Sequence, residues 1–96
     1  MSNYLAYIPL EIDENTHEVL TPEFSEYVDK GLLYGIIYNG SYGQLLQVIH
    51  NDPPIEESIG TNTVLISKQY YFTNLSSSVD LWIVFDETTQ KYYHMD

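Results

Sequence analysis

The stretch Asn62–Thr73 reads NTVLISKQYYFT and is the strongest β-strand signal in the chain. It is rich in β-branched and aromatic residues, which favour an extended backbone. Because side chains alternate along a strand, every second residue shares one face. Here that face is apolar, and its members are Val64, Ile66, Tyr70 and Phe72. We therefore expect a long strand with one buried side.

The residues that follow predict a hairpin at the C-terminal end. Asn74–Ser78 is a polar turn sequence, and Val79–Phe85 is a second strand-like run. A polar loop over Asp86–Gln90 then leads into a third run, Lys91–Met95. Two strand-like runs joined by a short polar loop are typical of a β-hairpin.

The segment before the long strand begins with an apolar run, Leu32–Tyr38, which we expect to be a buried strand. Asn39-Gly40 follows it, and this pair is typical of two-residue hairpin turns. Beyond Ser41, two patterns compete. The helical pattern comprises Tyr42, Leu45, Leu46 and Ile49, and the strand pattern comprises Leu46, Val48 and His50.

We favour the helix for this ambiguous segment. The prolines of Asn51–Pro54 should end either element, because the residue before a proline is pushed out of the α region. A loop up to Gly60 is then expected.

Near the N-terminus, Tyr4–Ile12 alternates like a strand, and Glu18–Leu20 could return beside it as a short hairpin. The next residues predict a helix over Pro22–Lys30, with Thr21 as its N-cap and Pro22 at its first position. Gly31 suits the left-handed residue that follows many helices.

Together these segments predict one α+β domain spanning residues 1–96. Its sheet should be mostly antiparallel with four to six strands, and one or two helices should pack on one face. Trp82 should lie on the strand face opposite Ile83. The expected core comprises Leu5 or Ile8, Phe24, Val28, Leu33, Ile36, Leu45, Ile49, Val64, Ile66, Leu81, Ile83 and Phe85.

The charge balance excludes several classes of function. The chain has three lysines, no arginine and fourteen acids, for a formal net charge of −11. Direct nucleic-acid binding needs a basic face, which three scattered lysines cannot form. The same deficit argues against binding an anionic membrane. No basic, apolar leader segment is visible at the N-terminus, so we expect a cytoplasmic protein.

The sequence offers little for catalysis, and we expect no enzyme activity, cofactor or metal. Cysteine is absent, which removes thiolate nucleophiles and sulfur ligands. Ser41 lacks the G-x-S-x-G context of a nucleophile elbow, so a tight turn is the better interpretation. His17, His50 and His94 have no metal-ligand spacing, and we interpret them as surface or partly buried histidines.

The acidic residues are the main functional candidates, because seven of them and no base precede Lys30. They gather at expected turns and element ends, where exposed carboxylates create a strong negative field. Such a field could serve only solubility, or it could bind a basic protein. The candidate binding residues are Asp13, Glu14, Glu18, Glu23, Glu26, Asp29, Asp52, Glu56, Glu57, Asp86 and Glu87.

In size and composition the chain resembles the small acidic inhibitors by which phages and mobile elements block restriction, CRISPR or other nucleic-acid-binding host proteins. Several of those inhibitors mimic DNA. The resemblance implies a partner that is a basic, nucleic-acid-binding enzyme or complex. The chain would bind it as a monomer or a homodimer. It rests on size and charge, and it assigns no role to any single residue.

Tyrosine leaves a second class of function open. Tyr70-Tyr71 and Tyr92-Tyr93 should each place one ring in the core and one outside, because neighbours on a strand face opposite ways. Outward tyrosines beside carboxylates suit protein interfaces, although they also stabilise cross-strand pairs. The alternative function is an immunity- or antitoxin-like protein, or a plain interaction module, that caps a basic partner without mimicking DNA.

Overall fold

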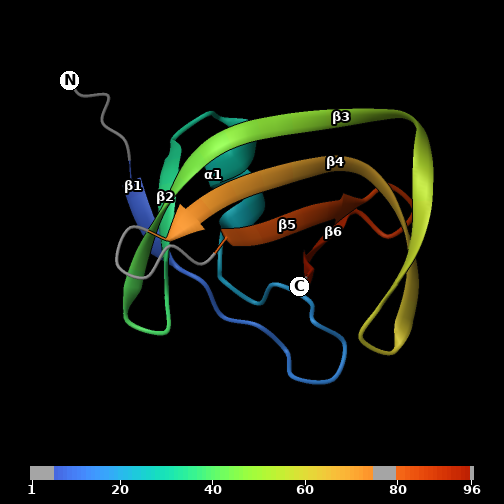
Figure 1. Ribbon diagram of the computed structural model, residues 1–96, viewed down its shortest axis with the longest axis horizontal. Coiled ribbons are helices and arrows are strands. Elements are labelled where there is room, and N and C mark those ends of the chain that lie inside the picture. The colour runs from blue at the N-terminus through green and yellow to red at the C-terminus, as the bar shows by residue number, and fades with distance from the viewer. Residues whose placement is uncertain (1–5, 75–79, 96) are drawn as a thin grey trace.

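Six strands form one sheet in the order of the sequence in the computed structural model, which describes residues 6–74 and 80–95 (Figure 1). β1 and β2 are parallel, and every other neighbouring pair is antiparallel. This confirms the predicted sheet of four to six strands. The elements are β1 (Ala6–Pro9), α1 (Phe24–Asp29), β2 (Leu33–Tyr38), β3 (Ser41–Ile59), β4 (Asn62–Asn74), β5 (Asp80–Asp86) and β6 (Lys91–Met95).

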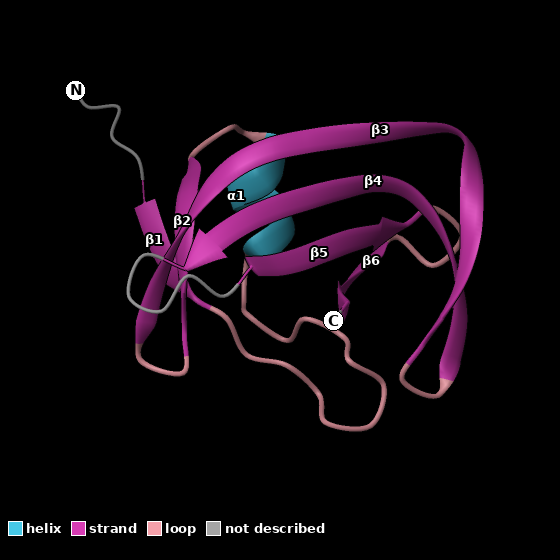
Figure 2. Cartoon of the chain, in the orientation of Figure 1, coloured by secondary structure: helices cyan, strands magenta, loops and turns pink. Residues whose placement is uncertain are grey.

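Figure 2 shows α1 as the one helix among the described residues. Its Phe24 is buried in the core and contacts the Tyr92 ring edge-on, with the ring centroids 5.0 Å apart. Gly31 has a φ of 69°, and the amides of Gly31 and Leu32 donate to the carbonyls of Val28 and Tyr27. This left-handed ending is the predicted one. No helix in the described part of the chain is long and apolar enough to cross a membrane.

The predicted start of this helix is wrong. Thr21 is not the N-cap, because its hydroxyl donates to the Pro9 carbonyl (2.7 Å) and accepts from the Glu11 amide (2.9 Å). α1 instead begins at Phe24, after Glu23 in the left-handed conformation (φ 63°) with no side-chain cap. The Thr21 hydroxyl, which was predicted to cap the helix, instead binds the backbone at the end of β1 and just after it.

The helix predicted over Tyr42–Ile49 is also wrong, because these residues belong to β3. Asn39-Gly40 forms the expected turn, with φ values of 52° and 78°, and it sends β3 back along β2. β3 then pairs with β4 from Gly43 to Ile59. A bulge at Leu46 shifts the alternation of side chains along β3, so Leu45 and Val48, three residues apart, pair with Phe72 and Tyr70 of β4.

The loop expected up to Gly60 is likewise a strand. β3 passes through Asp52-Pro53-Pro54 with a shift of register between His50 and Ile55. Prolines fit here because β2 pairs only with Ser41–Gln44, so this part of β3 lacks a strand on its other side. Figure 1 shows β3 and β4 bending together beyond this point.

The bend divides the apolar face of β4 between two cores. Tyr70 and Phe72 belong to the main core, which contains the buried Ile8, Leu10, Phe24, Leu33, Ile36, Leu81, Ile83 and Tyr92. Val64 and Ile66 lie beyond a bulge at Ser67. They join a second core with Ile59, Val84 and Tyr93. β5 therefore has buried side chains on both faces, with Ile83 in the main core and Val84 in the second core.

The predicted core is largely confirmed, with a few differences. Val28, Leu45, Ile49 and Phe85 are half-buried rather than buried. Val84 is completely buried, because the bent end of β3 and β4 covers the β5 face that carries Trp82. Tyr4 and Leu5, the 75–78 part of the expected turn, and Val79 lie outside the described residues.

Asp86, the last residue of β5, is almost completely buried, with 2% of its surface exposed. It links β4 to the turn between β5 and β6. Its carboxylate accepts hydrogen bonds from the amides of Leu65 (3.2 Å) and Thr88 (3.0 Å) and from the Thr89 hydroxyl (2.8 Å). The bond to Leu65 fastens β4 to the β5–β6 turn. Asp86 therefore has a structural role.

We predict that Asp86→Ala lowers the free energy of unfolding by roughly 2–4 kcal/mol, because it leaves several donors without their acceptor. Urea unfolding followed by tryptophan fluorescence measures this change. Glu87→Ala is the matched control, since Glu87 is exposed, and its effect should stay within about 0.5 kcal/mol. Equal stability of the two variants would contradict the role assigned to Asp86.

Candidate functional site

The acidic segment Glu11–Asp29 comprises the chain that leaves β1 together with α1. Asp13 and Glu18 are half-buried in this segment. Its other acids are exposed, and they are Glu11, Glu14, Glu23, Glu26 and Asp29. Five of the seven carboxylates of this segment are therefore exposed to solvent.

The sheet holds the first half of the acidic segment in place. Ile12 and Val19 pair across a short hairpin, and the Leu20 amide donates to the Glu11 carbonyl (2.6 Å). Glu18 pairs in turn with Tyr93 of β6. The expected return of Glu18–Leu20 beside the first strand is therefore present as bridges rather than as a full strand.

The Asp13 carboxylate organises the turn of this hairpin. Its Oδ1 accepts hydrogen bonds from the amides of Asn15 (2.8 Å) and Thr16 (3.0 Å). The bond from Thr16, followed by that from Asn15, lowers the pKa of Asp13 below its ordinary value. Asp13 is consequently ionised at neutral pH and fixed in direction.

We define the α1 stripe as three exposed acids: Glu26 and Asp29, which are three residues apart on the helix, and Glu23, which directly precedes it. Lys30 pairs with Glu26 at 3.2 Å, but both side chains are more than half exposed. Exposed ion pairs of this type contribute at most about 1 kcal/mol. The stripe therefore keeps its negative field.

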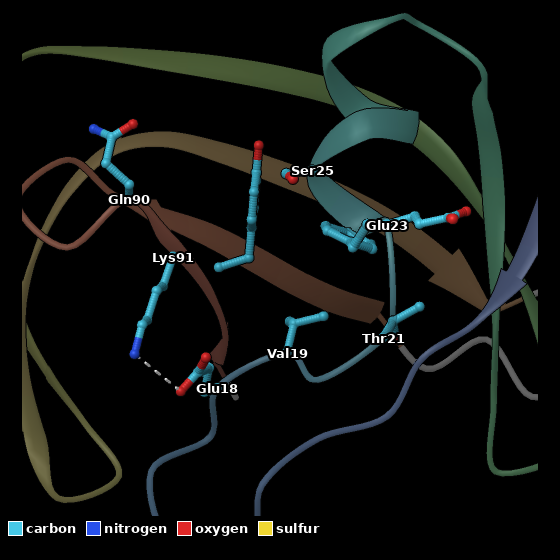
Figure 3. Close-up of a pocket in the computed structure, with 9 residues that line it drawn as sticks. Glu18, Val19, Thr21, Glu23, Ser25, Gln90 and Lys91 are labelled. Carbon is cyan, nitrogen blue, oxygen red and sulfur yellow. Dashed lines mark ion pairs between the residues drawn. The ribbon is translucent and has the colours of Figure 1, made fainter.

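A shallow cleft of about 180 Å³ lies between the acidic segment and β6. Figure 3 shows Glu18 and Lys91 pointing toward one another across it, with their charged atoms 3.6 Å apart. Glu23 and Ser25 border the cleft on the α1 side, and Gln90 borders it on the other. The cleft thus offers carboxylate, hydroxyl and amide groups at the surface.

The other candidate acids lie apart from this segment. Asp52, Glu56 and Glu57 are exposed on the distal part of β3. Glu87 is exposed in the turn between β5 and β6. Asp86 is not a surface residue, since it is buried at the end of β5. Nothing local in the sequence distinguishes Asp86 from Glu87. The Leu65 amide that donates to the buried Asp86 carboxylate lies far away in the sequence.

His17 and His94 lie close together, which the sequence analysis did not predict. The pairing of His17 with β6 brings its ring to 6.5 Å from that of His94, which is buried and 5.3 Å from the Tyr38 ring. A second cleft, of about 370 Å³, contains His17 together with Asp13 and Glu14. Within residues 6–74 and 80–95, no three His, Asp or Glu side chains are grouped to hold a metal.

The tyrosine pairs follow the prediction only in part. Tyr70 is buried, and burial strongly raises its pKa, with a further contribution from Tyr92. Tyr71 is half-exposed on the opposite face and packs against Trp82, with ring centroids 4.7 Å apart. Tyr92 and Tyr93 are both buried, however, because the second core covers the outer face of β6.

Comparison of the chain with protein-family models, curated proteins and solved structures gives no match. The acidic segment must therefore be interpreted from its own geometry and charge.

We predict that Asp13 contributes to stability in a pH-dependent manner. Its folded-state pKa is lowered, so the contribution is present above the unfolded-state pKa of about 3.9 and is lost as pH falls through the folded-state pKa. Asp13→Asn should flatten this part of the stability curve. Thermal unfolding between neutral and strongly acidic pH measures the effect, and Glu14→Gln is the control. Identical pH profiles for Asp13→Asn and the unmodified protein would contradict the prediction.

Proposed function

We propose that the protein binds and inhibits a basic protein whose own ligand is nucleic acid, using the acidic segment Glu11–Asp29 as its interface. The observation that carries the proposal is the fixed group of exposed carboxylates in this segment, opposed by only two ion-paired lysines. Asp52, Glu56 and Glu57 could extend the interface. Asp86 is omitted because it is buried.

Geometry supports an interface of this kind. Side chains three residues apart on a helix have Cβ atoms about 5–6 Å apart, so Glu26 and Asp29 of the α1 stripe present two closely spaced negative charges. The hairpin that carries Asp13 and Glu18 is tied to β6 by backbone hydrogen bonds. A row of anions held in fixed positions can occupy the sites where a partner binds backbone phosphates.

The proposed role is that of a DNA-mimicking inhibitor of restriction, CRISPR or related defence systems, encoded by a phage or mobile element. The protein acts in the cytoplasm in this proposal, without catalysis, cofactor or metal. Its negative field would speed association with a basic partner at low salt. At physiological salt the acceleration would be smaller, because charges farther apart than a Debye length of about 8–10 Å are screened from one another.

The second candidate is an immunity- or antitoxin-like protein that caps a basic enzyme without imitating DNA. The half-exposed pair Tyr71 and Trp82 favours it, because aromatic side chains are common anchors of protein interfaces. In that case aromatic contacts, rather than the carboxylate row, would govern dissociation.

We predict that a partner captured from the native host competes with duplex DNA for this protein. Affinity should fall between low and physiological salt, and the DNA should be displaced from the partner. Replacing both Glu23 and Glu26 by Lys should lower the association rate about tenfold, because it reverses two charges of the α1 stripe. Surface plasmon resonance at two salt concentrations measures both effects.

The matched control reverses Asp80 and Glu87, two exposed acids outside the segment, and changes the net charge by the same amount. It should retain most of the association rate. A partner that keeps its nucleic acid while bound to this protein would refute mimicry and support the immunity-like alternative. Equal losses in the two double variants would show that net charge, rather than the acidic segment, drives binding.

A further inference from the structure

The sheet has an open edge along β3. β2 pairs with β3 only over Ser41–Gln44, and from Leu45 onward β3 pairs with β4 alone among the described strands. In Figure 1 β3 forms the upper border of the ribbon over this stretch. We define the open edge as Leu45–His50, the part of β3 between β2 and the prolines. An unpaired edge presents backbone donors and acceptors that another extended chain can use.

Exposed apolar side chains gather on the same strand. Of the seven large hydrophobic residues exposed in the described structure, four belong to β3, and they are Tyr42, Leu46, Val48 and Ile55. Leu46 is the most exposed of the seven, at 55%. A chain added beside the open edge would cover apolar surface as well as backbone groups.

The prolines and bulges of β3 limit where a chain can add. Pro53 and Pro54 lack amide protons, and the register shift between His50 and Ile55 interrupts the ladder. These features discourage indiscriminate pairing of long strands. They leave the open edge, with the bulge at Leu46 near its start, as a short segment that accepts a short partner strand.

The charge around the open edge selects the occupant. β3 contains Asp52, Glu56 and Glu57 and no lysine or arginine, and the one lysine paired with it is Lys68 of β4, opposite His50. A second copy of this chain would bring another net charge of −11 to the same place, which self-repulsion opposes. A segment that carries lysine or arginine is instead attracted to these acids.

We propose that the open edge Leu45–His50 binds an extended, lysine- or arginine-bearing segment of the partner by β-strand addition. Backbone hydrogen bonds supply affinity in this mode, and alternate side chains supply specificity. The apolar side chains of the segment cover Leu46 and Val48, and its basic side chains face the acids of distal β3. The inference rests on the proposed function in one respect, namely that the partner is basic.

The test uses a short synthetic peptide that alternates lysine and valine, with a glutamate–valine peptide as its control. Amide hydrogen exchange and chemical shifts of the protein are followed by NMR during titration. The lysine peptide should slow exchange in Leu45–His50, whereas the glutamate peptide should leave it unchanged. No nucleic acid or native partner is involved in this test. It can therefore fail while the competition with DNA succeeds, and it can succeed while that competition fails.

Leu46→Glu separates strand addition from simple charge attraction. It removes apolar surface while adding a negative charge, so strand addition predicts about tenfold weaker binding of the lysine peptide, whereas pure charge attraction predicts tighter binding. Leu20→Glu is the matched control, because Leu20 is 49% exposed and lies outside β3. It should not weaken binding.

Several results would overturn the proposal. They are tighter binding by Leu46→Glu, protection confined to the acidic segment, and no detectable binding of the lysine peptide. Concentration-dependent protection of the open edge without any peptide would instead assign the edge to a second copy of the chain.

Discussion

The structure depends on the way the short segment His17–Val19 joins the far edge of the sheet. The Val19 amide donates to the Tyr92 carbonyl, and the His94 amide donates to the His17 carbonyl, both at 2.8 Å. Because Val19 also pairs with Ile12, these bonds connect β6 to the chain that leaves β1. The sheet thereby closes around the main core. The same bonds hold the hairpin that carries the first acids of the acidic segment.

This closure explains how so acidic a chain can present a defined surface. A net charge of −11 opposes the compact state through self-repulsion, and two exposed ion pairs offset little of it. Two hydrophobic cores and a continuous ladder of backbone bonds provide the stability instead. Carboxylates fixed on such a frame lose little further freedom on binding, so more of their interaction energy remains for affinity.

The sequence predicts those elements whose signals are local. Alternating apolar residues in Asn62–Thr73 and the Asn39-Gly40 turn correctly indicate strands. Features that depend on distant residues are missed. The bulge at Leu46 interrupts the simple alternation of β3, and the Thr21 hydroxyl donates to Pro9 instead of capping a helix. The Leu65 amide donates to the buried Asp86 carboxylate, which the sequence places on the surface.

The central claim is that the first half of the acidic segment is fixed to the sheet rather than forming a solubilising loop. Native-state hydrogen exchange followed by NMR tests it most directly, because the amides of Leu20, Val19 and His94 donate the bonds that fix this segment. The account predicts that these three amides are protected to a similar degree as the amides of β4 and β5. Exchange at the rate of an unstructured chain would contradict it.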